Sequence, residues 1–251
     1  MPEVWLDKGK TLTRAAVVEG RKLVGLEVDS SACTPRAGAR YVAKVMRFNP
    51  DLGIAEMDLG GTQAFLSLKR RAIEPGKLVV VEWQAPATGN KQAVVKLLPK
   101  EQASGKPRLL EDGPDALART GLAVTREGDF ELIDLESQID ALLQRVVPLP
   151  DGGSLVFDIT EIGHLIDINS GSGKDINRIA LPEVARQIRL RNLGGIILID
   201  CVGSRRAGLA ELLRAEVAAD PCTVEVFGIT KLGLIECTRV RRGYPLSVLL
   251  A

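Results

Sequence analysis

Residues 152–200 decide the fold class of this chain, and they read GGSLVFDITEIGHLIDINSGSGKDINRIALPEVARQIRLRNLGGIILID. SLVFDIT, after a glycine turn, predicts a strand, and HLIDINSG predicts a second strand that ends in a polar loop. LPEVARQIRLRN has apolar residues at helical spacing; Pro182 in its first turn and Gly194-Gly195 beyond it predict its two ends. GIILID is apolar throughout, as expected for a central strand of a sheet.

The pattern continues to the end of the chain. GLAELLRAEVAAD predicts a second helix that ends before Pro221, and CTVEVFGIT and LGLIECTRV predict two closing strands. Strands that alternate with helices in this way favour an α/β sandwich, here over residues 152–251.

The first part of the chain has a different pattern. Residues 1–34 predict a short strand followed by a hairpin. Residues 35–98 hold five short strand candidates separated by turn signals, which favours a small closed barrel of the OB-fold type. Residues 99–118 are polar and rich in proline and glycine, so we expect a linker or shortened connection. Residues 130–147 have helical spacing, and Asp134 or Ser137 could cap that helix.

Composition excludes some classes of protein but does not identify the function. The chain has 251 residues, 45% of them hydrophobic and 26% charged, which is ordinary for a globular protein. It has no apolar run of about eighteen residues and no secretory signal pattern, so we expect a cytoplasmic protein that does not bind membranes. Four dispersed cysteines and a single histidine make a local zinc site improbable. The net charge of +1 gives no global argument for nucleic-acid binding.

Two acidic residues stand at the carboxyl ends of apolar strands, Asp167 in HLIDINSG and Asp200 in GIILID. Ligands bind at that edge of an open α/β sheet. With the carboxamide of Asn169, the two carboxylates would form an oxygen-rich site suited to Mg²⁺ or Mn²⁺. Such an ion can polarise a phosphodiester and activate water. Glu161 lies six residues before Asp167, an even spacing that would put both on one face of a strand. The alternative interpretation is ordinary strand-end, capping or loop residues.

The same residues carry a family resemblance. GGSLVFDITEIGHLIDINSGSG, INRIALPEVARQIRLRNLGGIILIDCVG and KLGLIECTRVRR resemble the catalytic subdomain of the RNase E/G endoribonucleases, nearly continuously from Gly152 to Arg241. Residues 37–98 resemble the family's inserted OB-fold domain. The resemblance implies RNase H-like and DNase I-like catalytic subdomains. Residues 1–34 and 119–151 would form the first, residues 152–251 the second, and residues 35–98 the inserted barrel.

The resemblance also implies roles for individual residues. Asp167 and Asp200 match the family's metal-binding aspartates, Asn169 its supporting asparagine, and Glu161 the glutamate of its TEAL motif. The implied RNA contacts fall on Asn177, on Arg186, Arg189 and Arg191 of the ARQIRLR motif, on Lys231, Arg239 and Arg241, and on Phe65 as a base-stacking aromatic. For each of these the alternative is a structural role, as helix surface, ion pair or barrel core.

Departures from the family pattern refine the expected activity. Glu56-Met57 replaces a second aromatic of the barrel face, and Gly203 replaces a second acid after Asp200. Only about twenty polar residues stand where the family has its 5′-end sensor, so we expect cleavage that does not depend on the 5′ end. The sequence ends before the family's zinc-linking segment, which predicts no zinc-linked tetramer and leaves a homodimer through the catalytic subdomain open.

The favoured hypothesis is therefore a metal-dependent endoribonuclease that hydrolyses single-stranded RNA to 5′-phosphate and 3′-hydroxyl ends. The main alternative is a non-catalytic RNA-binding or regulatory protein on a degenerate nuclease scaffold. A ribosome-assembly factor built on the barrel has little else in its favour. The retained carboxylate pair favours the enzyme, because two like charges placed close together are unfavourable without a cation.

Overall fold

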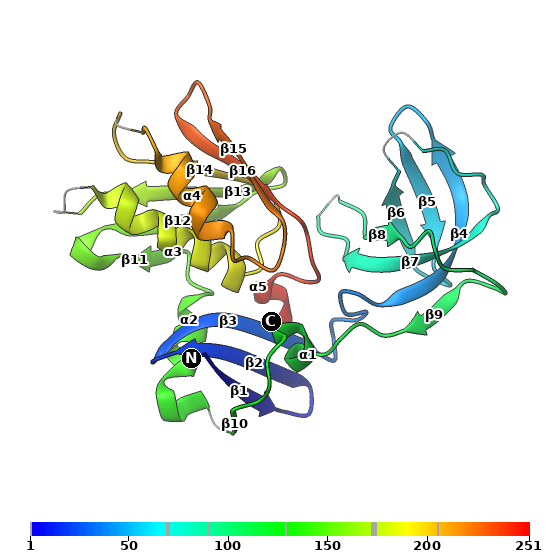
Figure 1. Ribbon diagram of the computed structural model, residues 1–251, viewed down its shortest axis with the longest axis horizontal. Helices are drawn as coiled ribbons and strands as arrows, with labels where there is room; N and C mark the ends of the chain where they lie inside the picture. The colour runs from blue at the N-terminus through cyan, green and yellow to red at the C-terminus, as the bar shows by residue number, and fades with distance from the viewer. Residues whose placement is uncertain (1, 69–70, 90, 129, 172–174, 205) are drawn as a thin grey trace.

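The computed structural model describes residues 2–68, 71–89, 91–128, 130–171, 175–204 and 206–251. They form three lobes (Figure 1): a small sheet beside both chain ends, a β-barrel, and a larger sheet with two helices. We call these the terminal sheet, the barrel and the larger sheet. In the described part of the chain, no helix is long and apolar enough to cross a membrane.

The terminal sheet has the strand order β10-β1-β2-β3, which leaves β3 as an edge strand. The strands are β1 (Glu3–Lys8), β2 (Leu12–Glu19), β3 (Lys22–Ser30) and β10 (Arg126–Glu127). Short helices pack around it: α1 (Ala116–Thr120), the 3-10 helix η1 (Phe130–Ile133), α2 (Leu135–Ala141) and α5 (Leu246–Leu249). Its core joins Trp5, Leu23 and Phe130 to Leu190 and Leu246, which come from distant parts of the chain. The hydrophobic effect therefore fixes this lobe to the end of helix α3 (Ile176–Leu190).

The barrel closes on itself, because β5 pairs with both β6 and β4 in the ring β4-β5-β6-β8-β7. Its strands are β4 (Arg40–Asn49), β5 (Ile54–Asp58), β6 (Gln63–Ser67), β7 (Leu78–Ala85) and β8 (Val94–Leu97). The predicted five-stranded, OB-like barrel is confirmed. The polar connection after it is more ordered than a linker, since β9 (Arg108–Glu111) pairs with β4 and helix α1 follows.

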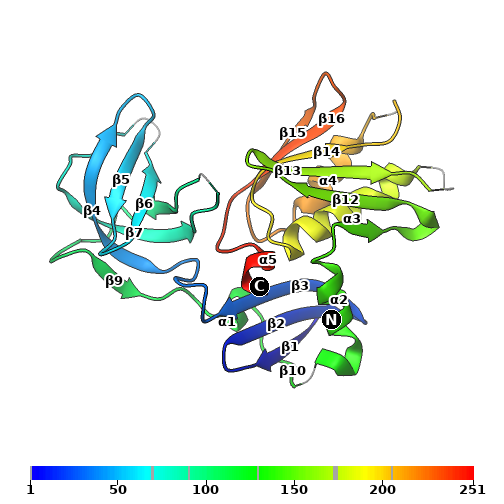
Figure 2. The same ribbon diagram turned by 180° about the vertical axis from the view of Figure 1, so that it is seen from behind.

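The larger sheet has the order β11-β12-β13-β14-β16-β15, in which β13 and β14 are parallel and the other neighbours antiparallel. Its strands are β11 (Val146–Pro148), β12 (Ser154–Ile159), β13 (Gly163–Asn169), β14 (Gly195–Asp200), β15 (Val224–Ile229) and β16 (Leu234–Arg239). Helices α3 and α4 (Leu209–Val217) both cover the same face, in front of the strands in Figure 1 and behind them in Figure 2. The expected mixed α/β architecture is confirmed.

Strand alternation divides the larger sheet into a covered face and an open face. Ile166 and Ile197 point into the core beneath the helices and are at most 1% exposed. Their neighbours Leu165 and Ile196 point the other way and are 43% and 40% exposed. The open face is therefore accessible in this structure and carries charged side chains such as Asp158 and Glu236 as well as apolar ones. The polar residues at the ends of β13 and β14 also lie on it.

Two predicted helices differ from those observed. Helix α3 begins at Ile176, so Pro182 lies inside it and not in its first turn. Burial of Ile176 and Ala180 in the core extends the helix ahead of the proline. In the stretch 130–147 only α2 is a regular α-helix, preceded by the short 3-10 helix η1, and β11 takes its end. Asp134 occupies the position before α2 without a side-chain capping bond.

Candidate active site on the open face of the larger sheet

The two predicted metal-binding aspartates meet at one edge of the larger sheet. β13 and β14 run parallel, and Asp167 and Asp200 are direct register partners at their carboxyl ends. Neighbouring strands lie about 4.8 Å apart, so the two carboxylates share a small space. Both side chains lie on the open face and are exposed, which leaves them accessible to a cation and a substrate.

Asn169 extends this pair. It follows Asp167 by two residues on the same face of β13, and its Nδ2 donates a hydrogen bond of 3.0 Å to Asp167 Oδ2. The bond fixes the orientation of the Asp167 carboxylate and leaves the other oxygen free of this contact. The structure thus brings together three of the four predicted catalytic residues.

Glu161 is the exception. It lies in the turn that joins β12 to β13, at the opposite end of β13 from Asp167. The even spacing would have placed it on the same face of a continuous strand, but the hairpin turn before Gly163 ends the strand first. The prediction that Glu161 acts beside Asp167 does not fit this geometry.

Arg206 belongs to the same edge, although the sequence analysis did not single it out. Its Nη2 lies 3.6 Å from Asp200 Oδ1, and its side chain is 22% exposed. Arg206 stands in the loop between β14 and α4, where no periodic pattern or motif marks it. Only its closeness in sequence to Asp200 could have pointed to it.

Asn177, a predicted RNA contact, lies beneath the site. It is buried, its Nδ2 donates to the carbonyl of Val202, and its Oδ1 accepts from the amide of Val202, both at 2.9 Å. The side chain therefore acts as a clamp on the segment that follows Asp200. Its amide group already makes two intramolecular bonds in this conformation.

The arginines of the ARQIRLR motif have intramolecular partners as well. Arg186 donates to the carbonyl of Leu23 at 2.7 Å, and Arg189 donates to that of Val24 at 3.2 Å. Both acceptors belong to the edge strand β3, whose outer carbonyls have no neighbouring strand. The two guanidinium groups join helix α3 to the terminal sheet, and their predicted RNA contacts stay untested.

Arg191 and Arg239 are buried, at 8% and 3% exposure. The Arg191 guanidinium lies 4.2 Å from the ring centroid of Phe157, and burial lowers its pKa to about 10. Arg239 forms an ion pair of 3.0 Å with Asp220, whose side chain is also buried. Neither guanidinium group is available to a phosphate in this structure. The structure therefore does not support the RNA contacts predicted for Arg191 and Arg239.

The remaining predicted RNA contacts are spread over the molecule. Lys231 is exposed in the turn between β15 and β16, whereas Arg241 donates to the carbonyl of Pro86 in the barrel. Phe65 is partly exposed and lines a hollow on the barrel, where its register partner is Glu56. Met57 lies in the barrel core. Of the two residues that replace the family's second aromatic, Glu56 is therefore the one that lies on the surface beside Phe65.

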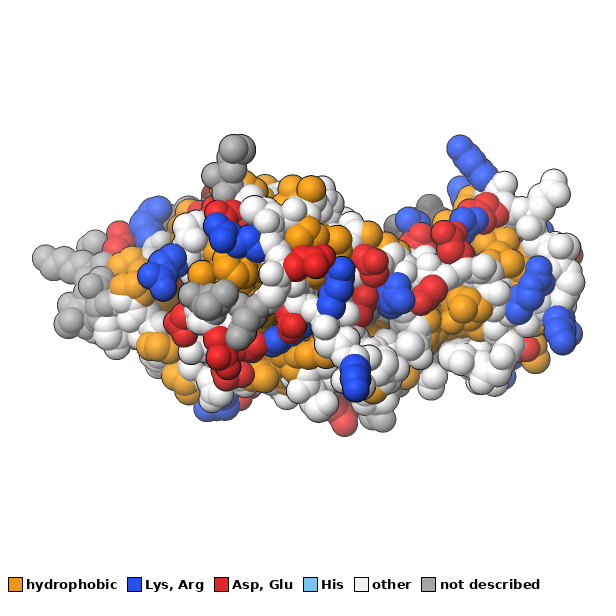
Figure 3. Space-filling model, turned by 90° about the horizontal axis from the view of Figure 1, so that it is seen from below, with side chains coloured by type: hydrophobic (Ala, Val, Ile, Leu, Met, Phe, Trp, Pro, Cys, Tyr) orange, Lys and Arg blue, Asp and Glu red, His pale blue; other side chains and the backbone are white. Residues whose placement is uncertain are grey.

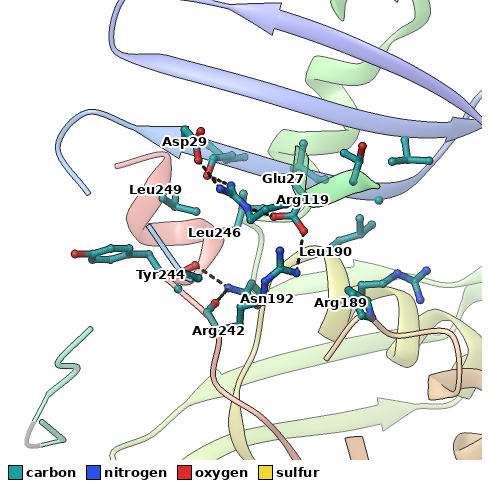
Figure 4. A pocket seen from close by; sticks show the side chains of 18 of the residues that line it. Glu27, Asp29, Arg119, Arg189, Leu190, Asn192, Arg242, Tyr244, Leu246 and Leu249 are labelled. Atoms are coloured by element: carbon teal, nitrogen blue, oxygen red, sulfur yellow. Dashed lines mark hydrogen bonds and ion pairs between the residues drawn. The ribbon is translucent and has the colours of Figure 1, made fainter. Parts of the chain in front are cut away.

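A cavity of about 290 Å³ lies away from the carboxylate pair, between β3, α1, the end of α3 and the C-terminal segment. Figure 4 shows Arg119 between Glu27 and Asp29, with Arg242 also directed at Glu27. The acids are thus paired with arginines from two other segments. This network joins the lobes and is separate from the candidate site.

The charges on one face of the molecule bear on whether a basic path that RNA could follow lies there. The underside of the molecule carries acidic and basic side chains mixed with apolar ones, without a continuous basic surface (Figure 3). The net charge of +1 agrees with this distribution.

Comparison with known proteins matches the candidate site to a family. The sequence model described as the Ribonuclease E/G family matches residues 111–242, more than half of the chain, and this range includes both aspartates. The chain belongs to the ribonuclease E/G family. The terminal sheet's first three strands and the barrel lie outside the matched range.

Relatives with curated names agree. The chain is 40% identical over 132 residues to a putative ribonuclease E of Buchnera aphidicola (subspecies Baizongia pistaciae), over 47% of this chain and 32% of the relative. It is 40% identical over 126 residues to ribonuclease E of Escherichia coli K12, 45% of this chain and 12% of the relative. It is 37% identical over 130 residues to ribonuclease G of the same strain, 46% and 27%. The chain thus spans less than a third of the length of these relatives.

Proposed function

We propose that this ribonuclease E/G family chain is a metal-dependent endoribonuclease that hydrolyses single-stranded RNA at the Asp167–Asp200 edge of the larger sheet. The observation that carries the proposal is the register pairing of these two exposed aspartates on adjacent parallel strands, with Asn169 bonded to one of them. The names of the relatives support the same activity.

The donor set fits a divalent cation of the Mg²⁺ or Mn²⁺ type. Asp167 and Asp200 would hold the ion through carboxylate oxygens, the ligands such ions prefer. No cluster of three or more acidic, histidine or cysteine side chains suited to a metal occurs among the described residues, so water and RNA oxygens would complete the coordination. When bound, the ion would supply Lewis acidity to the phosphodiester and to a nucleophilic water.

The chain's own residues position the reaction. Asn169 orients the Asp167 carboxylate, and Asn177 holds the segment after Asp200 through Val202. Exposed apolar side chains of the open face, including Leu165 and Ile196, lie on the same face as the carboxylates and offer van der Waals contact to unpaired bases. By the family resemblance, the products carry 5′-phosphate and 3′-hydroxyl ends.

Finer assignments belong to the same proposal. The terminal sheet would correspond to the RNase H-like subdomain and the larger sheet to the DNase I-like one. The connection between the barrel and the terminal sheet, which includes residues 99–118, contains β9 and α1 where the family has its 5′-end sensor. This short connection supports cleavage that does not depend on the 5′ end. A homodimer and a cytoplasmic location stay predictions.

The second candidate is an RNA-binding protein on a retired nuclease scaffold. The observation that favours it is Gly203, which stands where the family resemblance places a second acid after Asp200. This candidate predicts RNA binding without cleavage.

Cleavage of a labelled, unstructured RNA in Mg²⁺ and in EDTA separates the two. We expect cleavage in Mg²⁺ alone, with losses of at least a hundredfold in Asp167→Asn and Asp200→Asn. Asp158→Asn is a matched control, an aspartate of β12 in the same sheet that is paired with Arg145. RNA binding without cleavage by the wild type in Mg²⁺ or Mn²⁺ would support the retired scaffold.

A further inference from the structure

Arg206 places a guanidinium group next to the carboxylate pair without hydrogen-bonding it. Its Nη2 is 3.6 Å from Asp200 Oδ1, beyond the usual range of about 2.7–3.2 Å for such bonds. Asp200 itself stays 55% exposed. The contact is therefore a loose ion pair that leaves Nη2 of Arg206 and the oxygens of Asp200 open to other partners.

The position of this guanidinium is fixed from the other side. Its Nε donates to the carbonyl of Gly203 at 2.8 Å. Its Nη1 lies against Gly233, in the turn between β15 and β16, so closely that a Cβ on Gly233 would stand 2.0 Å from it. Gly233 has a φ of +91°, which favours glycine on conformational grounds too. Two backbone segments thus hold Arg206 at the edge where Asp200 ends its strand.

The held guanidinium has unused donors. Its Nη1 is buried and has no acceptor among the described residues. Buried donors of this kind are rare in folded proteins, and each one calls for a structural or functional reason. Because Nε donates to Gly203 and Nη1 is packed against Gly233, Nη2 beside Asp200 is the group left to donate to an anionic oxygen such as that of a phosphate.

We propose that Arg206 is a further catalytic residue of this site, whose Nη2 donates to an anionic oxygen of the phosphodiester held at Asp167 and Asp200. The proposal rests on the proposed function. In the reaction, the oxygen of a water forms a bond to phosphorus and the bond from phosphorus to the 3′ oxygen breaks. That oxygen takes up the proton that the water has lost. Arg206 transfers no proton; it balances the negative charge that builds up on the phosphate oxygens.

The alternative is that Arg206 only counterbalances the two carboxylates. The two roles predict different kinetics. A phosphate donor acts on the transition state, so its loss lowers kcat more than it raises KM. If Arg206 is only a counter-ion, it competes with the metal for the carboxylates. Its removal would then leave kcat nearly unchanged and tighten metal binding.

The test compares Arg206→Ala and Arg206→Lys with the wild-type chain. We expect kcat to fall by about a hundred- to a thousandfold in Arg206→Ala, as for loss of other transition-state donors, with partial recovery in Arg206→Lys. The Mn²⁺ affinity of the RNA-free protein should not weaken. Arg145→Ala is the matched control, an arginine also paired with an aspartate of the larger sheet; it should keep wild-type kcat. A kcat within about threefold of wild type in Arg206→Ala would overturn the proposal.

A second pair of variants tests the placement of Arg206 without changing it. Gly233→Ala would displace the guanidinium, whereas Gly228→Ala meets no atom within 4 Å. Both glycines have positive φ, at +91° and +134°, so both substitutions strain the backbone. For samples compared at equal folded fractions, only Gly233→Ala should lower kcat; equal kcat in both would count against the proposal.

Binding separates failure of this inference from failure of the proposed function. We would measure the affinity for a labelled RNA in Ca²⁺, with its integrity checked on a gel. If the wild type never cleaves, the nuclease proposal fails, and an affinity loss of about tenfold in Arg206→Ala but not Arg145→Ala would still establish the phosphate contact. Unchanged affinity in that case would overturn the contact as well.

Discussion

At the residue scale, the candidate site depends on side chains whose roles differ despite similar chemistry. Asn169 and Asn177 are both asparagines implied by the family resemblance. One is exposed and bonded to a carboxylate, and the other is buried and bonded to backbone on both sides of its amide. Burial therefore separates a residue that orients a carboxylate from one that holds the loop.

Asn177→Ala should lower the free energy of unfolding by about 1–2 kcal/mol, because it leaves the amide and carbonyl of half-buried Val202 without these partners. Asn169→Ala should leave stability within about 0.5 kcal/mol of wild type, since its site is exposed, and should weaken Mn²⁺ binding. Urea unfolding and Mn²⁺ titration of the two variants test this contrast. Equal stability of both would contradict the role of Asn177 as a clamp.

His164, the single histidine, predicts a pH dependence of stability. Burial lowers its pKa below the ordinary value of 6.5, an effect only partly offset by its hydrogen bond to the Gly194 carbonyl. The unfolded chain therefore binds a proton before the folded chain does. Stability is fully present above about pH 6.5 and falls as the pH drops through that value towards the folded pKa.

Urea unfolding between pH 7.5 and 5 measures this slope, and His164→Gln should remove it. Glu183 also has a lowered pKa, although burial alone would raise it, because Arg186 and Gln187 hydrogen-bond its carboxylate. Its contribution is lost only near and below pH 4.5, outside this window. An unchanged slope in His164→Gln would show that another group carries the effect.

At the element scale, helix α3 joins the larger sheet to the terminal sheet. Its apolar side packs beneath β12–β14, while Arg186 and Arg189 donate to carbonyls of the edge strand β3. A basic motif on a helix suggested RNA contact, because the sequence reveals charge and not the partner that neutralises it.

Arg186→Ala distinguishes these two roles. The structural role predicts a loss of about 1–2 kcal/mol of stability with RNA affinity within twofold of wild type, because a charged donor to a buried carbonyl is removed. The phosphate role predicts the reverse, unchanged stability and weaker binding that depends on salt. Urea unfolding and RNA binding at two salt concentrations decide between them.

The elements also show why part of the site could be predicted. Apolar runs that end in Asp167 and Asp200 predict parallel strands whose carboxyl ends meet, and register pairing follows from that geometry. Glu161 and the start of α3 could not be predicted in this way. A hairpin turn sets the position of Glu161, and core packing sets the start of α3. Neither cause can be read from the local spacing of apolar and polar residues. Arg206 depends on a contact with Gly233, 27 positions away.

At the scale of the whole molecule, the three lobes meet through polar contacts as well as packing. The barrel reaches the larger sheet through Lys91, which donates to the carbonyl of Ile162, and through Arg241, which donates to that of Pro86. The Glu27–Asp29 network joins the terminal sheet to the C-terminal segment (Figure 4). The carboxylate pair lies away from these junctions, on the solvent-exposed open face of the larger sheet.

A change of metal preference tests the central claim, that Asp200 holds the cation used in RNA cleavage. Asp200→Cys replaces a hard oxygen ligand by a soft sulfur, which favours Mn²⁺ or Cd²⁺ over Mg²⁺. We would measure RNA cleavage by this variant in each metal, with Asp158→Cys as control. The account predicts loss of cleavage in Mg²⁺, recovery in Mn²⁺ or Cd²⁺, and no such change in the control. Cleavage by Asp200→Cys in Mg²⁺ at the wild-type rate would contradict it.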